Sequence, residues 1–183
     1  MGAGILPTCI HNGQIHFLFG KENKHADTPG WSDFGGGSDN KETYMETAIR
    51  EGGEEMTGFL GSDNELSRML KEGNIHLDLK NKHSNKLYRM YIFHYSYDDK
   101  LPHYYNNNQR FLQKNLDEDI IKKTKIFEKE EIRWISIDEV RNMKSSFRSY
   151  FQSMVNKILV NENKIKRFLV NKSSTRKTRK NKK

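Results

Sequence analysis

The chain has 183 residues, enough for one domain with a substantial core and too few for two ordinary ones. Charged residues make up 31%, yet 10 Phe, 8 Tyr and 2 Trp supply large core-forming side chains. No apolar stretch is long enough to span a membrane, and the first residues lack a secretory leader pattern. A single cysteine, Cys9, excludes an intramolecular disulfide and a cysteine metal cluster. We therefore expect a soluble, cytoplasmic protein.

The net charge of +8 is concentrated at the end of the chain. Residues 164–183 contain ten Lys or Arg and no acidic residue, which leaves a charge of about −2 for residues 1–163. The sequence predicts a folded domain over residues 1–163 and a basic, disordered tail over residues 164–183. Such a tail can bind nucleic-acid phosphates. A tail that only increases solubility is an equal alternative.

The first half of the chain predicts a hairpin and a capped helix. Apolar runs at residues 5–10 and 14–19 flank Asn12-Gly13, a sequence typical of a tight β-turn. Residues 27–37 are rich in Gly and Asp and predict a loop with a short strand. Thr43 and Glu46 have capping-box spacing, and an apolar face at positions 45, 48, 49, 52 and 56 predicts a helix. Gly58 is expected to cap its C-terminus.

The second half predicts further strands and helices in alternation. Ser62 precedes a short helix, and strands are expected over residues 75–79 and 86–97, the second in the centre of a sheet. Residues 99–115 are rich in Tyr and Asn and predict an irregular loop. A strand over residues 132–135, a capped turn from Ser136 and an amphipathic helix over residues 147–159 follow. The pattern predicts an α/β fold, with a mixed sheet between helices.

Three carboxylates share one side of the first predicted helix. Glu51, Glu54 and Glu55 are spaced so that all three side chains lie close together. Like charges at this spacing repel and need a compensating cation. Hard oxygen ligands suit Mg²⁺ or Mn²⁺. A solvated acidic helix face is the alternative.

The segment from Gly36, GGSDNKETYMETAIREGGEEMTGF, resembles the box of Nudix hydrolases, Gly-x5-Glu-x7-Arg-Glu-U-x-Glu-Glu-x-Gly-U with U aliphatic. The matching residues are Gly36, Glu42, Arg50, Glu51, Glu54 and Glu55. Residues 31–36 and the late Glu131-Ile132-Arg133-Trp134 segment are also similar to family patterns, and the resemblance covers residues 3–160. It implies a Nudix-type α/β/α sandwich with a mixed β-sheet.

Two positions depart from the box. Gly52 replaces an aliphatic residue, and Gly58 arrives one residue late. If the extra residue follows Glu55, every ligand keeps its register, whereas an insertion before it would move Glu54 out of the site. The ungapped match favours the first alternative. Consecutive glycines cost roughly 1 kcal/mol each in a helix relative to alanine. We therefore expect a close neighbouring backbone beside Gly52 and Gly53.

The resemblance implies a role for each matched residue. The resemblance implies that Mg²⁺ or Mn²⁺ is bound by the Gly36 carbonyl, Glu51, Glu54 and Glu55. The catalytic set is Arg50, Glu54, Glu55 and Glu131, with Arg50 orienting the acids and Glu131, or its neighbour Glu130, as base or extra ligand. Glu42 is expected to be structural.

The implied function is cleavage of a phosphoanhydride in a nucleotide or nucleoside diphosphate-linked substrate, with a capped RNA among the candidates. Small Nudix proteins of large DNA viruses include decapping and diphosphoinositol polyphosphate enzymes, and the Lys- and Asn-rich composition of this chain would fit an AT-rich genome of that kind. A diphosphoinositol polyphosphate phosphohydrolase is thus one alternative. A catalytically silent RNA-binding member is another. It would use the basic tail and stack bases on Tyr104, Tyr105 and Phe111.

Overall fold

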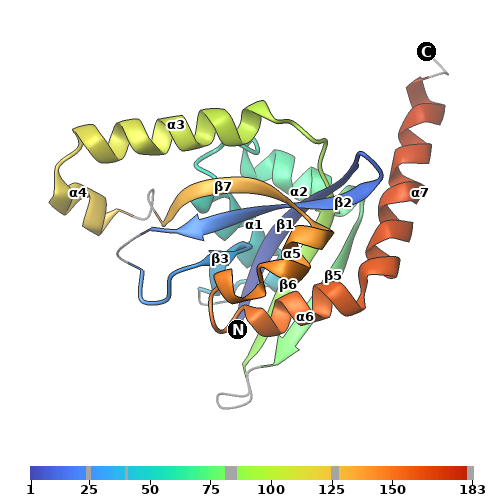
Figure 1. Ribbon diagram of the computed structural model, residues 1–183, viewed down its shortest axis with the longest axis horizontal. Coiled ribbons are helices and arrows are strands. Elements are labelled where there is room, and N and C mark those ends of the chain that lie inside the picture. The colour runs from blue at the N-terminus through green and yellow to red at the C-terminus, as the bar shows by residue number, and fades with distance from the viewer. Residues whose placement is uncertain (24–25, 40, 81–85, 125–127, 181–183) are drawn as a thin grey trace.

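The computed structural model describes residues 1–23, 26–39, 41–80, 86–124 and 128–180 (Figure 1). Across these residues, a mixed seven-stranded sheet lies between two layers of helices. One hydrophobic core packs α1, α2 and α3 against one face of the sheet, and a second packs α5, α6 and α7 against the other. The predicted α/β/α sandwich is confirmed.

The predicted hairpin forms the start of the sheet. Strands β1 (Gly2–His11) and β2 (Gln14–Glu22) pair antiparallel. Asn12 and Gly13 both have positive φ angles, 49° and 78°, as a type I′ turn requires. Successive side chains of a strand point to opposite faces of the sheet, so Phe17 packs into one hydrophobic core and Leu18 into the other.

The remaining strands extend the sheet on both sides of this hairpin. Strand β3 (Trp31–Ser32) pairs with β2, and β4 (Phe34–Gly37) pairs with β1. Strand β6 (Leu87–His94) runs parallel to β1 and lies between it and β5 (Asn74–Lys80), which confirms its predicted central position. Strand β7 (Lys129–Ser136) pairs antiparallel with β2.

Three helices begin at capping boxes, as their sequences indicate. Thr43, Ser62 and Ser136 accept hydrogen bonds from the third residue of α1, α2 and α5 respectively. The helices are α1 (Tyr44–Glu55), α2 (Asp63–Glu72), α3 (Lys100–Asn115), α4 (Glu118–Lys123), α5 (Ile137–Asn142), α6 (Gln152–Val160) and α7 (Glu162–Lys180), with a 3₁₀ turn η2 (Lys144–Ser146).

The predicted loop at residues 99–115 is wrong, since this segment is helix α3. Leu101, Tyr105 and Gln109 are buried at intervals of four residues, so one helical face packs on the sheet. The Asn106 side chain exchanges two hydrogen bonds with the Ile132 backbone, of 2.8 and 3.1 Å. Pro102 lies in the first turn, where its missing N–H is tolerated. Tertiary contacts therefore outweigh the weak helix propensities of Tyr and Asn.

The C-terminal part differs from its predicted boundaries. The amphipathic helix starts at Gln152, five residues later than expected, and Phe147 instead forms a bridge with Trp31. Helix α7 crosses the expected domain boundary at residue 163, and its Ile165 and Leu169 are fully buried in the core. Among the described residues, no helix has the length and apolarity needed to traverse a membrane.

The end of α1 explains the late glycine of the box. Helix α1 runs unbroken to Glu55, so the extra residue follows the glutamates. Thr57 therefore takes the left-handed conformation at the helix end, with φ 47°, and Gly58 follows at φ 79°. The expectation that Gly58 itself caps the helix is corrected by one residue. The space beside Gly52 is filled by the Ile5 side chain, and not by a neighbouring backbone.

Replacing Thr57 by glycine is expected to raise the free energy of unfolding by about 1 kcal/mol. A β-branched residue is strained at positive φ, and the buried Thr57 hydroxyl has no hydrogen-bond partner among the described residues. Thr57→Ala, which removes the hydroxyl but keeps the strain, is the matched control in a denaturant titration. A glycine variant no more stable than the alanine variant would contradict this account.

Candidate active site

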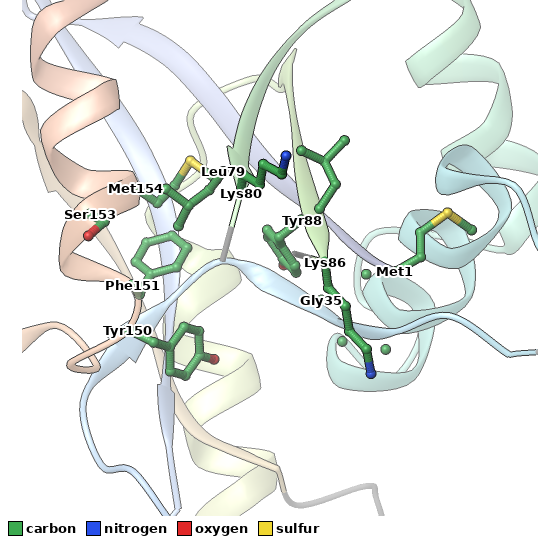
Figure 2. Close-up of a pocket in the computed structure, with 14 residues that line it drawn as sticks. Met1, Gly35, Leu79, Lys80, Lys86, Tyr88, Tyr150, Phe151, Ser153 and Met154 are labelled. Carbon is green, nitrogen blue, oxygen red and sulfur yellow. The ribbon is translucent and has the colours of Figure 1, made fainter. Parts of the chain in front are cut away.

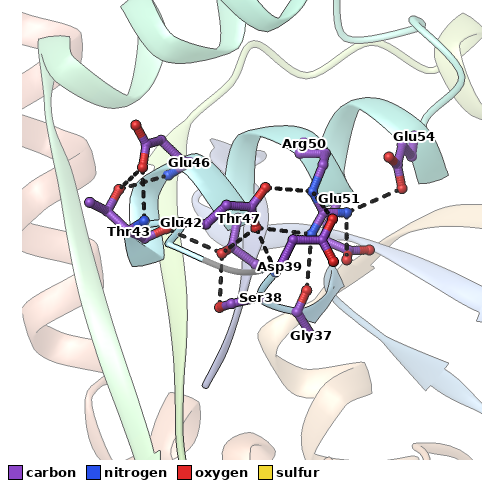
Figure 3. Close-up of polar contacts among 10 residues, drawn as sticks. All are labelled: Gly37, Ser38, Asp39, Glu42, Thr43, Glu46, Thr47, Arg50, Glu51 and Glu54. Atoms are coloured by element: carbon purple, nitrogen blue, oxygen red, sulfur yellow. Dashed lines mark hydrogen bonds and ion pairs between the residues drawn. The ribbon is translucent and has the colours of Figure 1, made fainter.

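Helix α1 brings two of the box glutamates to one cationic nitrogen (Figure 3). Arg50 Nη1 lies 2.8 Å from Glu51 Oε1 and 3.4 Å from Glu54 Oε2. Glu51 is buried, whereas the Glu54 side chain is 39% exposed. The Arg50 guanidinium thus contacts both carboxylates, and the Glu54 carboxylate is open to solvent.

Arg50 also ties the preceding loop to the helix. Its Nε donates to Glu42 at 2.7 Å, and its Nη2 donates to the Gly37 carbonyl at 2.9 Å (Figure 3). Glu42 in turn accepts hydrogen bonds from the Asp39 backbone and the Thr47 hydroxyl. The hydrogen bond from Arg50 lowers the pKa of Glu42 to about 2, with the Asp39 and Thr47 bonds acting in the same direction. Arg50 and Glu42 therefore fix the geometry of the loop that carries Gly37.

Strand β4 passes directly against the acidic side of α1. A Cβ atom on Gly36 would lie only 2.7 Å from the Glu51 carboxyl group, so a side chain there would displace that carboxyl group. The Gly35 backbone N–H donates to Glu55 Oε2 at 2.9 Å. The β4 backbone thus meets the carboxylates of α1 at Gly35 and Gly36, and Arg50 at Gly37.

Glu55 faces the protein interior and a buried lysine. The Lys129 ammonium is fully buried and contacts Glu22, Ser32 Oγ at 2.9 Å and Glu55 Oε1 at 3.3 Å. Burial alone would lower the pKa of Lys129, but the negative charges of Glu55 and Glu22 outweigh it and raise that pKa. Lys129 therefore places a positive charge inside the protein at neutral pH. Arg148 adds a second positive charge at Glu22.

A further acid extends this buried network. Burial raises the pKa of Asp33 to about 7, although the hydrogen bond from the Tyr88 hydroxyl, at 2.9 Å, opposes the shift. Burial likewise raises the pKa of Glu55, against the attraction of Lys129. Sequence reasoning missed the network because its members come from strands β2, β3, β6 and β7, from helix α1 and from connecting segments far apart in the sequence. The only local signal was an isolated Lys within the acidic run Glu128-Lys-Glu-Glu.

The late acids predicted from the Glu-x-x-Trp pattern, Glu130 and Glu131, both lie near Lys21. Lys21 pairs with Glu130 at 2.8 Å and approaches Glu131 at 4.0 Å, on the partly exposed β2–β7 surface. Within the same segment, Glu128 is the acid whose charge most strongly raises the pKa of Glu55. The charge of Glu128, two residues before Glu130, therefore acts on Glu55.

The similarity of this chain to known proteins is seen in its three-dimensional structure. No family model matches the sequence, and no curated protein matches it closely. An Ap4A hydrolase from C. elegans is 16% identical, with 86% of this chain and 95% of that chain covered and a TM-score of 0.52. The Nudix hydrolase RenU from M. smegmatis is 16% identical over 93% and 89% of the two chains, with a TM-score of 0.54.

A third similar structure is a bifunctional NMN adenylyltransferase/ADP ribose pyrophosphatase from Francisella tularensis, complexed with AMP and a Mn ion. It is 17% identical with a TM-score of 0.54, and the match covers 88% of this chain but only 41% of that one. The chain has the Nudix fold.

The donor set of this Nudix fold suits a hard divalent cation. Among the described side chains, no three acidic, His or Cys groups converge into a metal cage by themselves. Mg²⁺ at phosphate-processing sites is usually held by one or two carboxylates, with waters and substrate phosphates completing the shell. Glu51 and Glu54, which already converge on one cationic nitrogen, provide such a pair. Glu55 differs, because Lys129 and Gly35 engage its oxygens.

Proposed function

We propose that this protein is a Nudix pyrophosphohydrolase that uses Mg²⁺ or Mn²⁺ to cleave a phosphoanhydride in a nucleoside diphosphate-linked substrate. The observation that carries the proposal is the convergence of Glu51 and Glu54 on one cationic nitrogen beside the glycines of β4. When bound, the cation would neutralise phosphate charge and acidify a water molecule. Ser, Cys or His nucleophiles are not required.

Different side chains of the site bind the cation, orient its ligands and accept the proton. Glu51 and Glu54 hold the cation, and Arg50 orients both carboxylates while anchoring the Gly37 backbone. The Gly36 carbonyl is a further proposed ligand. Glu55 is positioned by the Gly35 N–H and by Lys129, so its negative charge is compensated inside the protein. A late carboxylate takes the proton from the attacking water.

We assign this late carboxylate to Glu128, whose charge acts on Glu55, with Glu131 or its neighbour Glu130 as the alternative. Glu128→Gln is expected to lower kcat by roughly 100-fold with little change in KM, because general-base catalysis acts on turnover and not on binding. Glu130→Gln and Glu131→Gln are the matched controls, since both acids lie at Lys21. A larger loss of kcat in Glu131→Gln would return the role to Glu131.

The function is tested by a hydrolysis screen. The purified protein is mixed with a dinucleoside polyphosphate, ADP-ribose, a capped RNA and an inositol pyrophosphate, each with Mg²⁺, with Mn²⁺ and with EDTA. We expect metal-dependent cleavage of at least one nucleoside-containing compound, with incorporation of one oxygen from labelled water. A protein inactive on all of them that still binds RNA would support the catalytically silent alternative.

The basic end of the chain is a proposed nucleic-acid contact. Residues 173–183 carry six Lys or Arg, and deleting them leaves the buried Ile165 and Leu169 and the contact of Lys172 with the Glu72 carbonyl in place. The deletion should not change hydrolysis of a small dinucleotide, yet it should weaken RNA binding at low salt. The slope of log affinity against log salt should fall by about 0.7 for each lost phosphate contact. An unchanged slope would show that this segment is not an RNA contact.

A further inference from the structure

The Lys129 ammonium lies among oxygen atoms, as a bound metal ion would. It contacts the Glu22 carboxylate, the Ser32 hydroxyl at 2.9 Å and the Glu55 carboxylate at 3.3 Å. The side chain of Lys129 is fully buried, and those of Glu22 and Glu55 are only 6% and 4% exposed. Two buried carboxylates need a compensating positive charge, and the lysine supplies it from inside the protein.

The pairing of β7 with β2 brings this lysine to α1. Lys129 lies opposite Glu22, where the register of the two strands shifts between Lys21 and Glu22. The aliphatic part of the lysine passes Gly20, and a Cβ atom at Gly20 would lie 2.8 Å from Lys129 Cδ. Glycine at this position therefore leaves room for the ammonium to reach Glu55.

A third acid lies in the same network, but it has a donor of its own. Asp33 is buried, and the Tyr88 hydroxyl donates to it at 2.9 Å. Tyr88 also lines a cavity of about 680 Å³ beside β4 (Figure 2). Glu22 and Glu55 are thus the acids that contact the ammonium directly.

A divalent cation would compete with Lys129 for Glu55. A metal ion bound to Glu55 Oε1 at about 2.1 Å would lie within about 5.4 Å of the ammonium, which is 3.3 Å from the same oxygen. Two positive charges this close repel each other, most strongly away from solvent. The second oxygen, Oε2, already accepts the Gly35 N–H at 2.9 Å. The Glu54 side chain, by contrast, is 39% exposed.

We propose that Lys129 takes the place of a second divalent cation at Glu55, so that the free protein binds one metal ion, through Glu51 and Glu54. The inference rests on the proposed function and departs from the metal-binding role that the resemblance implies for Glu55. Lys129 is a positioning residue in this account. Its charge holds Glu55 in the interior and leaves the other two carboxylates to the metal ion.

The first test removes the pair without changing the net charge. The Mn²⁺ affinity of Lys129→Met/Glu55→Gln should stay within about threefold of the wild type, whereas Glu54→Gln should weaken it by tenfold or more. The electron paramagnetic resonance signal of free Mn²⁺ measures both. Lys21→Met, at a lysine on the β2–β7 surface, is the control and should bind as the wild type does. A tenfold loss in the double variant would make Glu55 a ligand and overturn the inference.

The second test removes only the ammonium. Lys129→Ala opens a polar space beside Glu22, Ser32 and Glu55, which a divalent cation and its waters can fill. We expect this variant to bind two Mn²⁺ ions per chain and the wild type one. At a Mn²⁺ concentration about a hundredfold above Kd, its melting temperature should rise by about 5–10 °C more than that of the wild type. Adding Glu55→Gln should abolish both gains.

A Lys129→Ala variant that is unfolded without metal should fold when Mn²⁺ is added, because a cation that binds only the native state stabilises it. A single Mn²⁺ per chain, or no stabilisation beyond that of the wild type, would overturn the inference. Because these measurements need no substrate, they separate the two proposals. The expected Mn²⁺ binding without hydrolysis would keep the role of Lys129 and remove the hydrolase. Hydrolysis together with a tenfold loss in Lys129→Met/Glu55→Gln would do the reverse.

Discussion

Replacement of Lys129 by methionine is expected to lower the free energy of unfolding by about 3 kcal/mol. The variant leaves the carboxylates of Glu22 and Glu55 buried without the ammonium group between them, and among the described residues Arg148 still compensates Glu22. Breaking a buried ion pair by removing one partner leaves an uncompensated charge in the interior. Urea denaturation of the wild type and the variant at neutral pH measures the loss.

The matched control is Lys21→Met on the adjacent strand. Lys21 pairs with Glu130 on a partly exposed surface, so its removal should cost less than about 1 kcal/mol. Adding Glu55→Gln to Lys129→Met should recover part of the lost stability, because the carboxylate then no longer needs a cation. Equal losses in Lys129→Met and Lys21→Met, or no recovery in the double variant, would show that the network does not stabilise the fold.

Glu54→Gln is expected to lower the hydrolysis rate by at least about 100-fold, because loss of a metal ligand removes several kcal/mol of transition-state stabilisation. The fold should persist, since this side chain is partly exposed at the helix surface. Circular dichroism and the melting temperature check that point. Glu72→Gln, at an exposed acid at the end of α2, is the control and should retain full activity. Wild-type turnover in Glu54→Gln would remove this carboxylate from the reaction.

Features set by nearby residues could be predicted from the sequence. The Asn12-Gly13 turn and the capping box of Thr43 and Glu46 depend on residues within three positions of each other. The acidic face of α1 also follows from the sequence spacing of its glutamates alone. This spacing predicts that Glu51 and Glu54 lie close together, as the structure shows. Local rules therefore predicted the scaffold of the candidate site.

Features set by distant partners could not be predicted. Lys129 stands in an acidic run and resembles an exposed residue, and it becomes buried only because β7 pairs with β2 opposite Glu22, at an irregularity in the register. Helix α3 is similar, because Asn106 and Tyr105 satisfy backbone groups of β7 and α1 that no local pattern indicates. Such contacts exist only once the sheet has formed.

The most direct test of the metal site is a titration with Mn²⁺, followed by the electron paramagnetic resonance signal of the free ion. Outer-shell substitutions typically weaken metal binding by 10- to 100-fold, so replacing a ligand should do at least as much. We predict that the wild type binds Mn²⁺ and that Glu51→Gln and Glu54→Gln each weaken it by roughly tenfold or more, while Glu72→Gln does not. Equal Mn²⁺ affinity in all four proteins would contradict a catalytic cation on α1.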